Sequence, residues 1–302
     1  MKCFFVARRV AIMAVLALGC ANDFDPPSLV KGPRLLALVV DPPEAAPGQD
    51  IVFRALVASP DGAPLTLALR VDLSTRALAA GAGQTLGDQA EPIELAWDGE
   101  SAVLEGAETA RAIDSLLAEL GDAPPGTPEH VVRLVYEAVG LPLTVELELR
   151  DERGAIVLEG FKRFFLSPRA ARTTNPPGPR FAIDGRWVSA SSDPFTCEPE
   201  GEAPEVRAGA AVTLAPDPDD AGWLETYPAI DLEGEVIESS ESAFYSWYST
   251  AGSFSFAVTR APDREVEWTA PDEPGEHPLW LVVRDGHLGT SACRATVRVI
   301  DR

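Results

Sequence analysis

Lysine is almost missing from this 302-residue sequence, in which Lys2, Lys31 and Lys162 are the only three. All basic residues together number 25 against 47 acidic ones, which gives a formal net charge of −22. Binding to nucleic acid depends on clustered Lys and Arg that neutralise phosphates. The composition therefore excludes nucleic acid as a partner.

Catalytic motifs are also missing. The sequence has no GxSxG, HExxH, P-loop or glycine-rich nucleotide fingerprint. Its three histidines are the candidate general bases near neutral pH. His130 is expected at the start of a helix and His277 and His287 in turns, all three exposed to solvent. We expect no catalysis, with a hydrolase that uses an unrecognised site as the less favoured alternative.

Cysteine is scarce, and the expected roles of the four residues differ along the chain. Cys3 lies in the apolar leader described below, and Cys20 closes that leader. Cys197 and Cys293 remain as a candidate disulfide in an oxidising compartment. The alternatives are two buried thiols or half of a metal site, but there is no CxxC and no histidine at ligand spacing. No cofactor is expected.

The first 19 residues have the three regions of a secretory signal peptide. Lys2, Arg8 and Arg9 supply positive charge, and the apolar run 10–18 is too short to span a bilayer. The run ends in Leu-Ala-Leu-Gly-Cys at residues 16–20, which resembles the lipobox of bacterial lipoproteins and implies a lipid on Cys20. The alternative is an ordinary signal peptide cut near Gly19, with Cys20 as a free thiol.

Residues 20–34 then form a tether rich in proline and glycine. Stable anchoring takes more than one acyl chain, which bacterial lipoproteins obtain by multiple acylation of the cysteine. Ala21 follows Cys20, with no aspartate in that place, and the resemblance to known sorting rules favours the outer membrane. The protein is expected to face the periplasm or the cell surface and to bind the membrane through its N-terminal lipid.

Two β-rich domains are expected after the tether, at residues 35–169 and 181–302. The segment 170–180 between them contains three prolines and reads as a linker. Apolar residues alternate with polar ones over 65–72 and 143–150, which is typical of half-buried antiparallel strands. Gly48 and Gly62 are expected in turns before two of the strands.

A helical insertion is predicted at about 108–140. Apolar residues at 113, 116, 117 and 120 repeat at helical spacing and stop at Gly121, a favourable C-cap. A second helix is expected to begin with Thr127 as its cap and to bury one apolar stripe, although its valines also permit a strand. The predicted stripe comprises Val131, Leu134, Val135 and Ala138.

The second domain carries a family resemblance. Its segments FYSWYST at 244–250, WTAP at 268–271 and LWLVVRDG at 279–286 are similar to the PKD-like or immunoglobulin-like repeats of bacterial surface proteins. Residues 35–72 resemble the first strands of such a domain. The resemblance implies a mainly β chain of two immunoglobulin-like (PKD-like) β-sandwich domains, the first with a small helical insertion. It supplies no catalytic residues.

Carboxylates are concentrated between 198 and 241, where thirteen stand against the single base Arg207. This stretch is either solvated or binds cations. Asp217, Asp219 and Asp220 lie in one loop and are weak candidates for calcium ligands, since calcium takes oxygen ligands from such loops. Their spacing lacks the EF-hand order.

Aromatic residues suggest a further binding site. Tyr245 and Trp247 are expected to point into the core of the second domain, and Tyr248 outward. Trp223 and Tyr227 lie in segments without strand patterning. These two and Tyr248 form a weak candidate patch for a protein or a sugar.

The sequence as a whole predicts a lipid-anchored cell-envelope protein that acts as a scaffold or a binding module for protein or polysaccharide. A calcium-dependent adhesion module is the alternative.

Overall fold

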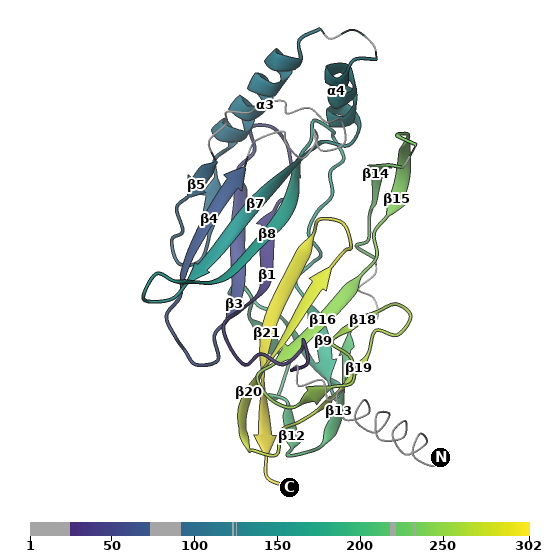
Figure 1. Cartoon of the computed structure of the whole chain (residues 1–302). Coiled ribbons are helices and arrows are strands. Elements are labelled where there is room, and N and C mark those ends of the chain that lie inside the picture. The colour runs from purple at the N-terminus through teal and green to yellow at the C-terminus, as the bar shows by residue number, and fades with distance from the viewer. Residues whose placement is uncertain (1–24, 73–91, 123, 125, 218–221, 232) are drawn as a thin grey trace, which may run out of the picture.

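The structure is a computed structural model that describes residues 25–72, 92–122, 124, 126–217, 222–231 and 233–302. The expected signal peptide, Cys20, Asp219 and Asp220 lie outside these residues. The described chain is mainly β and forms two β-sandwiches, as expected, with a pair of helices at the far end of the first (Figure 1).

The first sandwich packs a three-stranded sheet against a five-stranded one. The smaller sheet has the order β1 (Arg34–Asp41), β3 (Ile51–Ala58), β6 (Ala102–Leu104). The larger has the order β2 (Glu44–Ala45), β8 (Ile156–Leu166), β7 (Leu141–Arg150), β4 (Thr66–Asp72), β5 (Ile93–Leu95). Phe53 and Phe164 meet edge to face between the sheets, with ring centroids 5.7 Å apart. The alternation predicted for β4 and β7 is confirmed, because every second residue of each is buried.

The predicted turns and helices are confirmed in position. Gly48 and Gly62 have positive φ and precede β3 and β4. α3 (Gly106–Leu120) ends where the N–H of Gly121 donates to Leu117 O, and α4 (Pro128–Ala138) begins at Thr127, whose hydroxyl accepts from the N–H of His130.

The predicted buried face of α4 is wrong. Val131 and Leu134 are about half exposed, whereas Val132 and Tyr136 are buried. These two are one helical turn apart, and the large Tyr136 ring fixes the rotation of the helix toward the core. Val131 and Leu134 are left on the solvent side.

The second sandwich has a six-stranded and a five-stranded sheet. The first has the order β11 (Cys197–Pro199), β10 (Arg186–Ala190), β9 (Arg180–Ile183), β13 (Ala211–Pro216), β19 (Val266–Thr269), β17 (Ser253–Phe254). The second has the order β12 (Glu205–Arg207), β21 (Thr290–Ile300), β20 (Gly275–Arg284), β16 (Phe244–Ser249), β18 (Val258–Arg260). Tyr245 and Trp247 are buried in its core, as predicted, and Trp268 is buried there as well.

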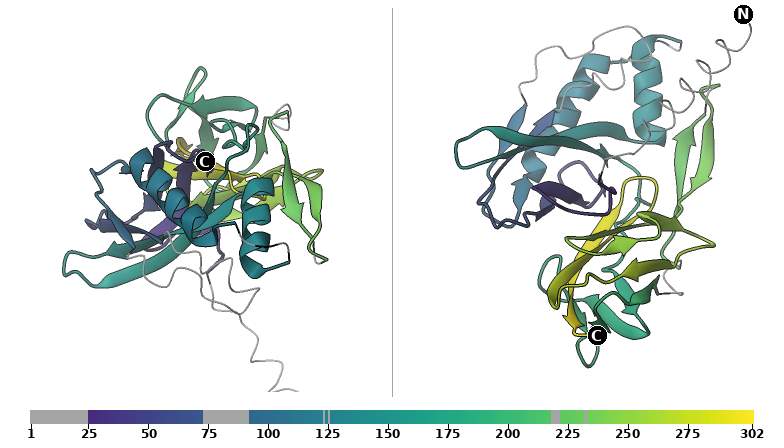
Figure 2. Two further views of the ribbon diagram at one scale, coloured as in Figure 1. Left: turned by 90° about the horizontal axis from the view of Figure 1, so that it is seen from above. Right: turned by 60° about the horizontal axis from the view of Figure 1, so that its bottom comes forward.

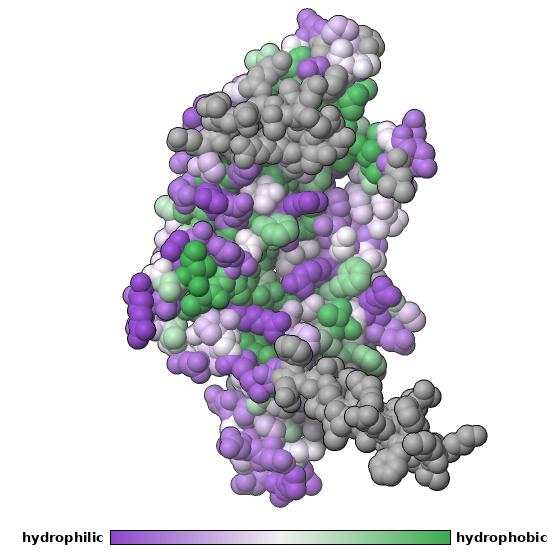
Figure 3. Space-filling view, in the orientation of Figure 1, coloured by the Kyte–Doolittle hydropathy of each residue, from purple (hydrophilic) through white to green (hydrophobic). Residues whose placement is uncertain are grey.

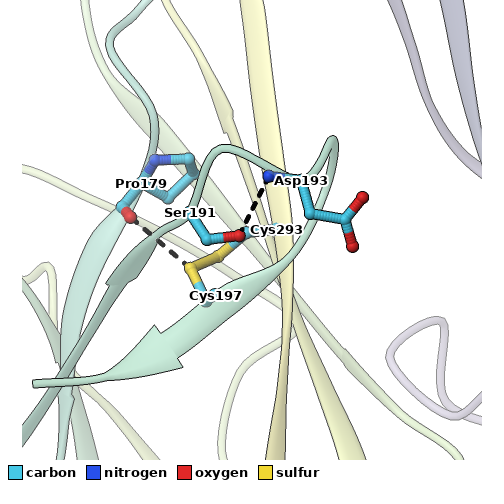
Figure 4. The surroundings of a disulfide bond; sticks show 5 residues. All are labelled: Pro179, Ser191, Asp193, Cys197 and Cys293. Atoms are coloured by element: carbon cyan, nitrogen blue, oxygen red, sulfur yellow. Dashed lines mark hydrogen bonds between the residues drawn. A yellow bond between two sulfur atoms is a disulfide. The ribbon is translucent and has the colours of Figure 1, made fainter.

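The expected disulfide is present. Cys197 on β11 and Cys293 on β21 are bonded, with their Cα atoms 5.4 Å apart, so the bond joins the two sheets (Figure 4). Cys197 Sγ also lies 3.5 Å from the carbonyl oxygen of Pro179, just before β9. The bridge therefore fixes the start of the second sandwich to its last strand.

A separate two-stranded sheet projects from the second sandwich. β14 (Thr226–Ile230) and β15 (Val236–Ser240) form a hairpin that pairs with no other described strand. In Figures 1 and 2 it runs alongside the first sandwich, and its tip lies next to α4.

Candidate functional site

The two sandwiches meet through a third apolar cluster. β1 and β3 contribute one side and β20 and β21 the other, and Val30 from the N-terminal segment joins them. Trp280 and Val282 belong to this cluster, whereas Leu281 between them points into the core of the second sandwich. The unbroken apolar runs of β1 and β20 were the signal for this junction, because a strand buried on both faces loses its alternation.

The segment 170–180, which we expected to be a linker, has no helix or strand before Arg180 but is bonded to both sandwiches. Asn175 donates from Nδ2 to Val40 O at 2.8 Å and accepts at Oδ1 from the N–H of Thr290 at 2.9 Å. Arg284 of β20 donates to Leu36 O of β1 at 3.1 Å. Polar contacts therefore reinforce the apolar junction.

Glu44 holds the beginning of this segment. Its side chain is 1% exposed, and Arg169 Nη2 donates to Glu44 Oε1 at 2.5 Å. The N–H and hydroxyl of Thr173 donate to Oε2 at 2.9 and 3.2 Å. Both carboxylate oxygens are thus satisfied in the interior, as a buried charge requires.

The turn between β20 and β21 carries His287 into the junction. The ring of His287 stacks on Tyr227 with centroids 3.6 Å apart and lies 6.0 Å from Phe165. Burial lowers the pKa of His287 to about 4. The expectation that His287 is exposed to solvent is therefore wrong, and His277 lies in β20 and not in a turn.

The N-terminal segment also departs from the sequence prediction. We expected a tether over 20–34, but Ser28 and Val30 are buried. The N–H of Val30 donates to Ser249 O at 2.8 Å, and the N–H of Ser249 donates to Ser28 O at 3.0 Å. The chain is therefore fixed on β16 of the second sandwich before β1 begins.

A cleft of about 320 Å³ opens at the junction. β1 is the end strand of its sheet, and β8 pairs on its outer side with β2 at two residues only, so two strand edges face one another there. The β20–β21 turn closes the third side (Figure 1). The cleft is lined by residues 35–38, 161–163 and 284–290.

A second exposed feature lies at the helix end of the molecule. Large apolar side chains are 41–53% exposed on both α4 and the β14–β15 hairpin. We call them the helix–hairpin surface, and hydrophobic groups are visible at this end in Figure 3. Its members are Val131, Leu134, Ile230, Val236 and Ile237.

The hairpin is acidic as well as apolar. Asp231, Glu233, Glu235 and Glu238 lie along the hairpin, and the sequence has no Lys, Arg or His between 222 and 241. Its base is fixed, because Trp223 and Leu224 pack against the second core and the Glu225 carboxylate accepts from the N–H and hydroxyl of Thr174. The hairpin thus presents apolar and negatively charged groups from a supported base.

The three aromatics of the predicted patch lie in different surroundings. Trp223 packs partly against the second core, Tyr227 stacks on His287, and Tyr248 packs at the junction with the Arg34 guanidinium 5.5 Å above its ring. Trp223 and Tyr227 support the hairpin. The apolar groups exposed beyond them are aliphatic and were missed, because the sequence shows no strand pattern there.

Asp217 is the one calcium candidate among the described residues. Arg180 donates to Asp217 Oδ2 at 2.5 Å and also pairs with Glu200, and both partners raise the pKa of Arg180. The Glu200 carboxylate is likewise held by Arg180. Within the described part of the chain, no group of three or more His, Cys, Asp or Glu is placed to hold a metal.

Glu241 is a buried carboxyl close to the hairpin base. Its Oε2 accepts from the N–H of Glu225, whereas Oε1 has no hydrogen-bond partner. Burial raises the pKa of Glu241 to about 7. None of the described helices is both long and apolar enough to cross a membrane.

Solved structures similar to this chain include fibronectin(III)-like modules. Those of Clostridium thermocellum CbhA are 11% identical, with a TM-score of 0.25 over 89% of this chain and 94% of that one. A nucleoside hydrolase-related hypothetical protein from Saccharophagus degradans is 15% identical, with a TM-score of 0.25 over 44% of this chain and 28% of that one. Bacteroides ovatus SGBP-B, solved with a mixed-linkage heptasaccharide, is 11% identical, with a TM-score of 0.21 over 90% of this chain and 48% of that one.

This chain therefore spans less than a third of the hydrolase-related protein and about half of SGBP-B. TM-scores of this size carry no weight for function, and the β-sandwich assignment rests on the strand pairings described above. No protein-family model matches the sequence, and no curated protein matches it.

Proposed function

We propose that this chain is a lipid-anchored cell-envelope protein that acts as a binding module and scaffold, without catalysis. Its partner is another envelope protein, and an envelope polysaccharide is the second candidate. The observation that carries the proposal is the helix–hairpin surface, because soluble proteins seldom expose apolar groups together without using them for contact.

The fixed N-terminal segment supports a definite orientation. Cys20 lies eight positions before Ser28, so an extended chain between them reaches about 28 Å at most. Ser28 is hydrogen-bonded to β16 of the second sandwich. A lipid on Cys20 would therefore hold the second sandwich close to the membrane and direct the helix pair and hairpin tip away from it.

Charge and strand geometry favour a basic protein segment as the partner. Four carboxylates of the hairpin would attract Lys and Arg, and complementary charge speeds and orients association. The outer edges of β14 and β15 pair with no other described strand, so an extended segment could add to the hairpin as a further strand. The apolar side chains would then contact its alternate residues.

Photo-cross-linking in cells tests this function. A photoreactive residue at Ile237 is expected to give a discrete cross-linked product, whereas the same residue at Phe256, which is 67% exposed on the second sandwich, is expected to give none. The double variant I230D/V236D is expected to abolish the product at 237. Equal products from both positions, or none from either, would contradict the proposal.

A further inference from the structure

The junction cleft gathers cations that form no ion pair with a described carboxylate. Lys162, Arg163 and Arg284 line it, and no described carboxylate lies within 4.0 Å of their charged nitrogens. The chain has a net charge of −22 and only three lysines. Three cations without a described ion-pair partner in one cleft are therefore unusual for a chain of this composition.

The neutral groups of the cleft hold two of these cations in place. Lys162 Nζ donates to Thr290 Oγ1 at 2.5 Å, and Arg284 donates to Ser246 Oγ at 3.0 Å and to Leu36 O. These contacts use one donor of Lys162 and two of the five of Arg284, so several charged N–H groups remain for a ligand.

The one carboxylate that lines the cleft already accepts hydrogen bonds at both of its oxygens. Asp285 is 1% exposed, and its two oxygens accept from the N–H of His287 at 2.7 Å and of Gly289 at 2.6 Å. Asp285 attracts Lys162 and Arg284 repels it, but burial is the largest effect and lowers the pKa of Lys162 to about 8. The cleft thus holds an excess of positive charge at neutral pH.

Phe161 stands at the mouth of the cleft and is 71% exposed, the largest exposed fraction among the large apolar side chains described. An aromatic face beside cationic donors suits a ligand that has an uncharged ring next to a charged group. Acidic sugars have this combination of a carboxylate or phosphate and an apolar ring face.

We propose that the junction cleft is a binding site for an oxyanion, the carboxylate or phosphate of a small ligand whose uncharged part lies on Phe161. Arg284 and Lys162 hold the oxyanion from the two sandwiches, and Arg163 adds charge at the rim. The site is separate from the helix–hairpin surface, and the two proposals stand independently. Because the ligand contacts both sandwiches, binding would also strengthen the junction.

Chemical labelling of lysine tests the site, because it reports Lys162 separately from Lys31. Reductive methylation of the full-length protein, followed by peptide mass spectrometry from pH 6 to 10, reports Lys162, with the exposed Lys31 as internal control. A bound oxyanion favours the charged amine, which is not methylated. Phosphate or glucuronate is therefore expected to shift the pH at which Lys162 becomes labelled to a higher value, by about one pH unit or more. The Lys31 profile is expected to stay unchanged.

Three controls define the outcome. Sodium chloride at matched ionic strength and neutral glucose are expected to leave Lys162 unchanged, and R163Q is expected to weaken the protection several-fold. Protection by phosphate alone would identify a phosphate ligand, and protection by glucuronate alone a carboxylate ligand. No protection by either anion, or equal protection by chloride or glucose, would overturn the proposal.

Discussion

Replacing Cys197 and Cys293 by alanine is expected to lower the free energy of unfolding of the second sandwich by about 2–4 kcal/mol. The two cysteines are 96 positions apart and both are buried. A cross-link over about 100 residues restricts the unfolded chain by up to about 4.7 kcal/mol in the chain-entropy account. The bond also joins opposite sheets, so its loss removes a tie across the core.

Urea unfolding followed by tryptophan fluorescence measures this effect. Five of the six tryptophans lie within 181–302, and Trp97 is the exception, so the signal reports mainly the second sandwich. The wild-type chain unfolded under reducing conditions should match the double variant. A double variant within about 0.5 kcal/mol of the oxidised wild type would show that the bond has no stabilising role.

Replacing Glu44 by alanine is expected to cost about 3 kcal/mol of unfolding free energy. The change removes the buried acceptor of Arg169 and Thr173, and breaking one side of a buried ion pair typically costs about 3–5 kcal/mol. The Arg169 side chain is 21% exposed and can regain some water, which places the expected value at the low end. The interdomain segment would lose its first attachment as well.

Glu146→Ala is the matched control for this prediction. Glu146 pairs with Arg70 on the same sheet, and both side chains are about half exposed, so its loss should cost less than about 1 kcal/mol. Differential scanning calorimetry of both variants measures the contrast. Equal costs for the two variants would contradict the view that Glu44 fixes the segment between the sandwiches.

The local pattern of the fold could be predicted from the sequence, because it depends on neighbours along the chain. Strict alternation located β4 and β7, and Thr127 and Gly121 marked helix ends. The Cys197–Cys293 bond followed from the small number of cysteines. The strands and helix ends could be predicted from a few adjacent residues, and the disulfide could be predicted by eliminating the other two cysteines.

The junction and its cleft depend on residues far apart in sequence. Lys162 meets Thr290 and Arg284 meets Leu36 across more than a hundred positions, and no local pattern indicates such a pairing. The rotation of α4 was mispredicted for a related reason. Helical spacing predicted one apolar stripe, but the packing of Tyr136 against the core turns a different face of the helix inward.

The proposed location and the proposed orientation both depend on the proposed lipid anchor on Cys20, so the mass of the mature chain tests the account most directly. The measurement is the intact mass of the protein purified from membranes, with C20A prepared in parallel. We expect an acylated chain that begins at Cys20, and an unacylated C20A chain in the soluble fraction. An unmodified wild-type chain in the soluble fraction would contradict the account.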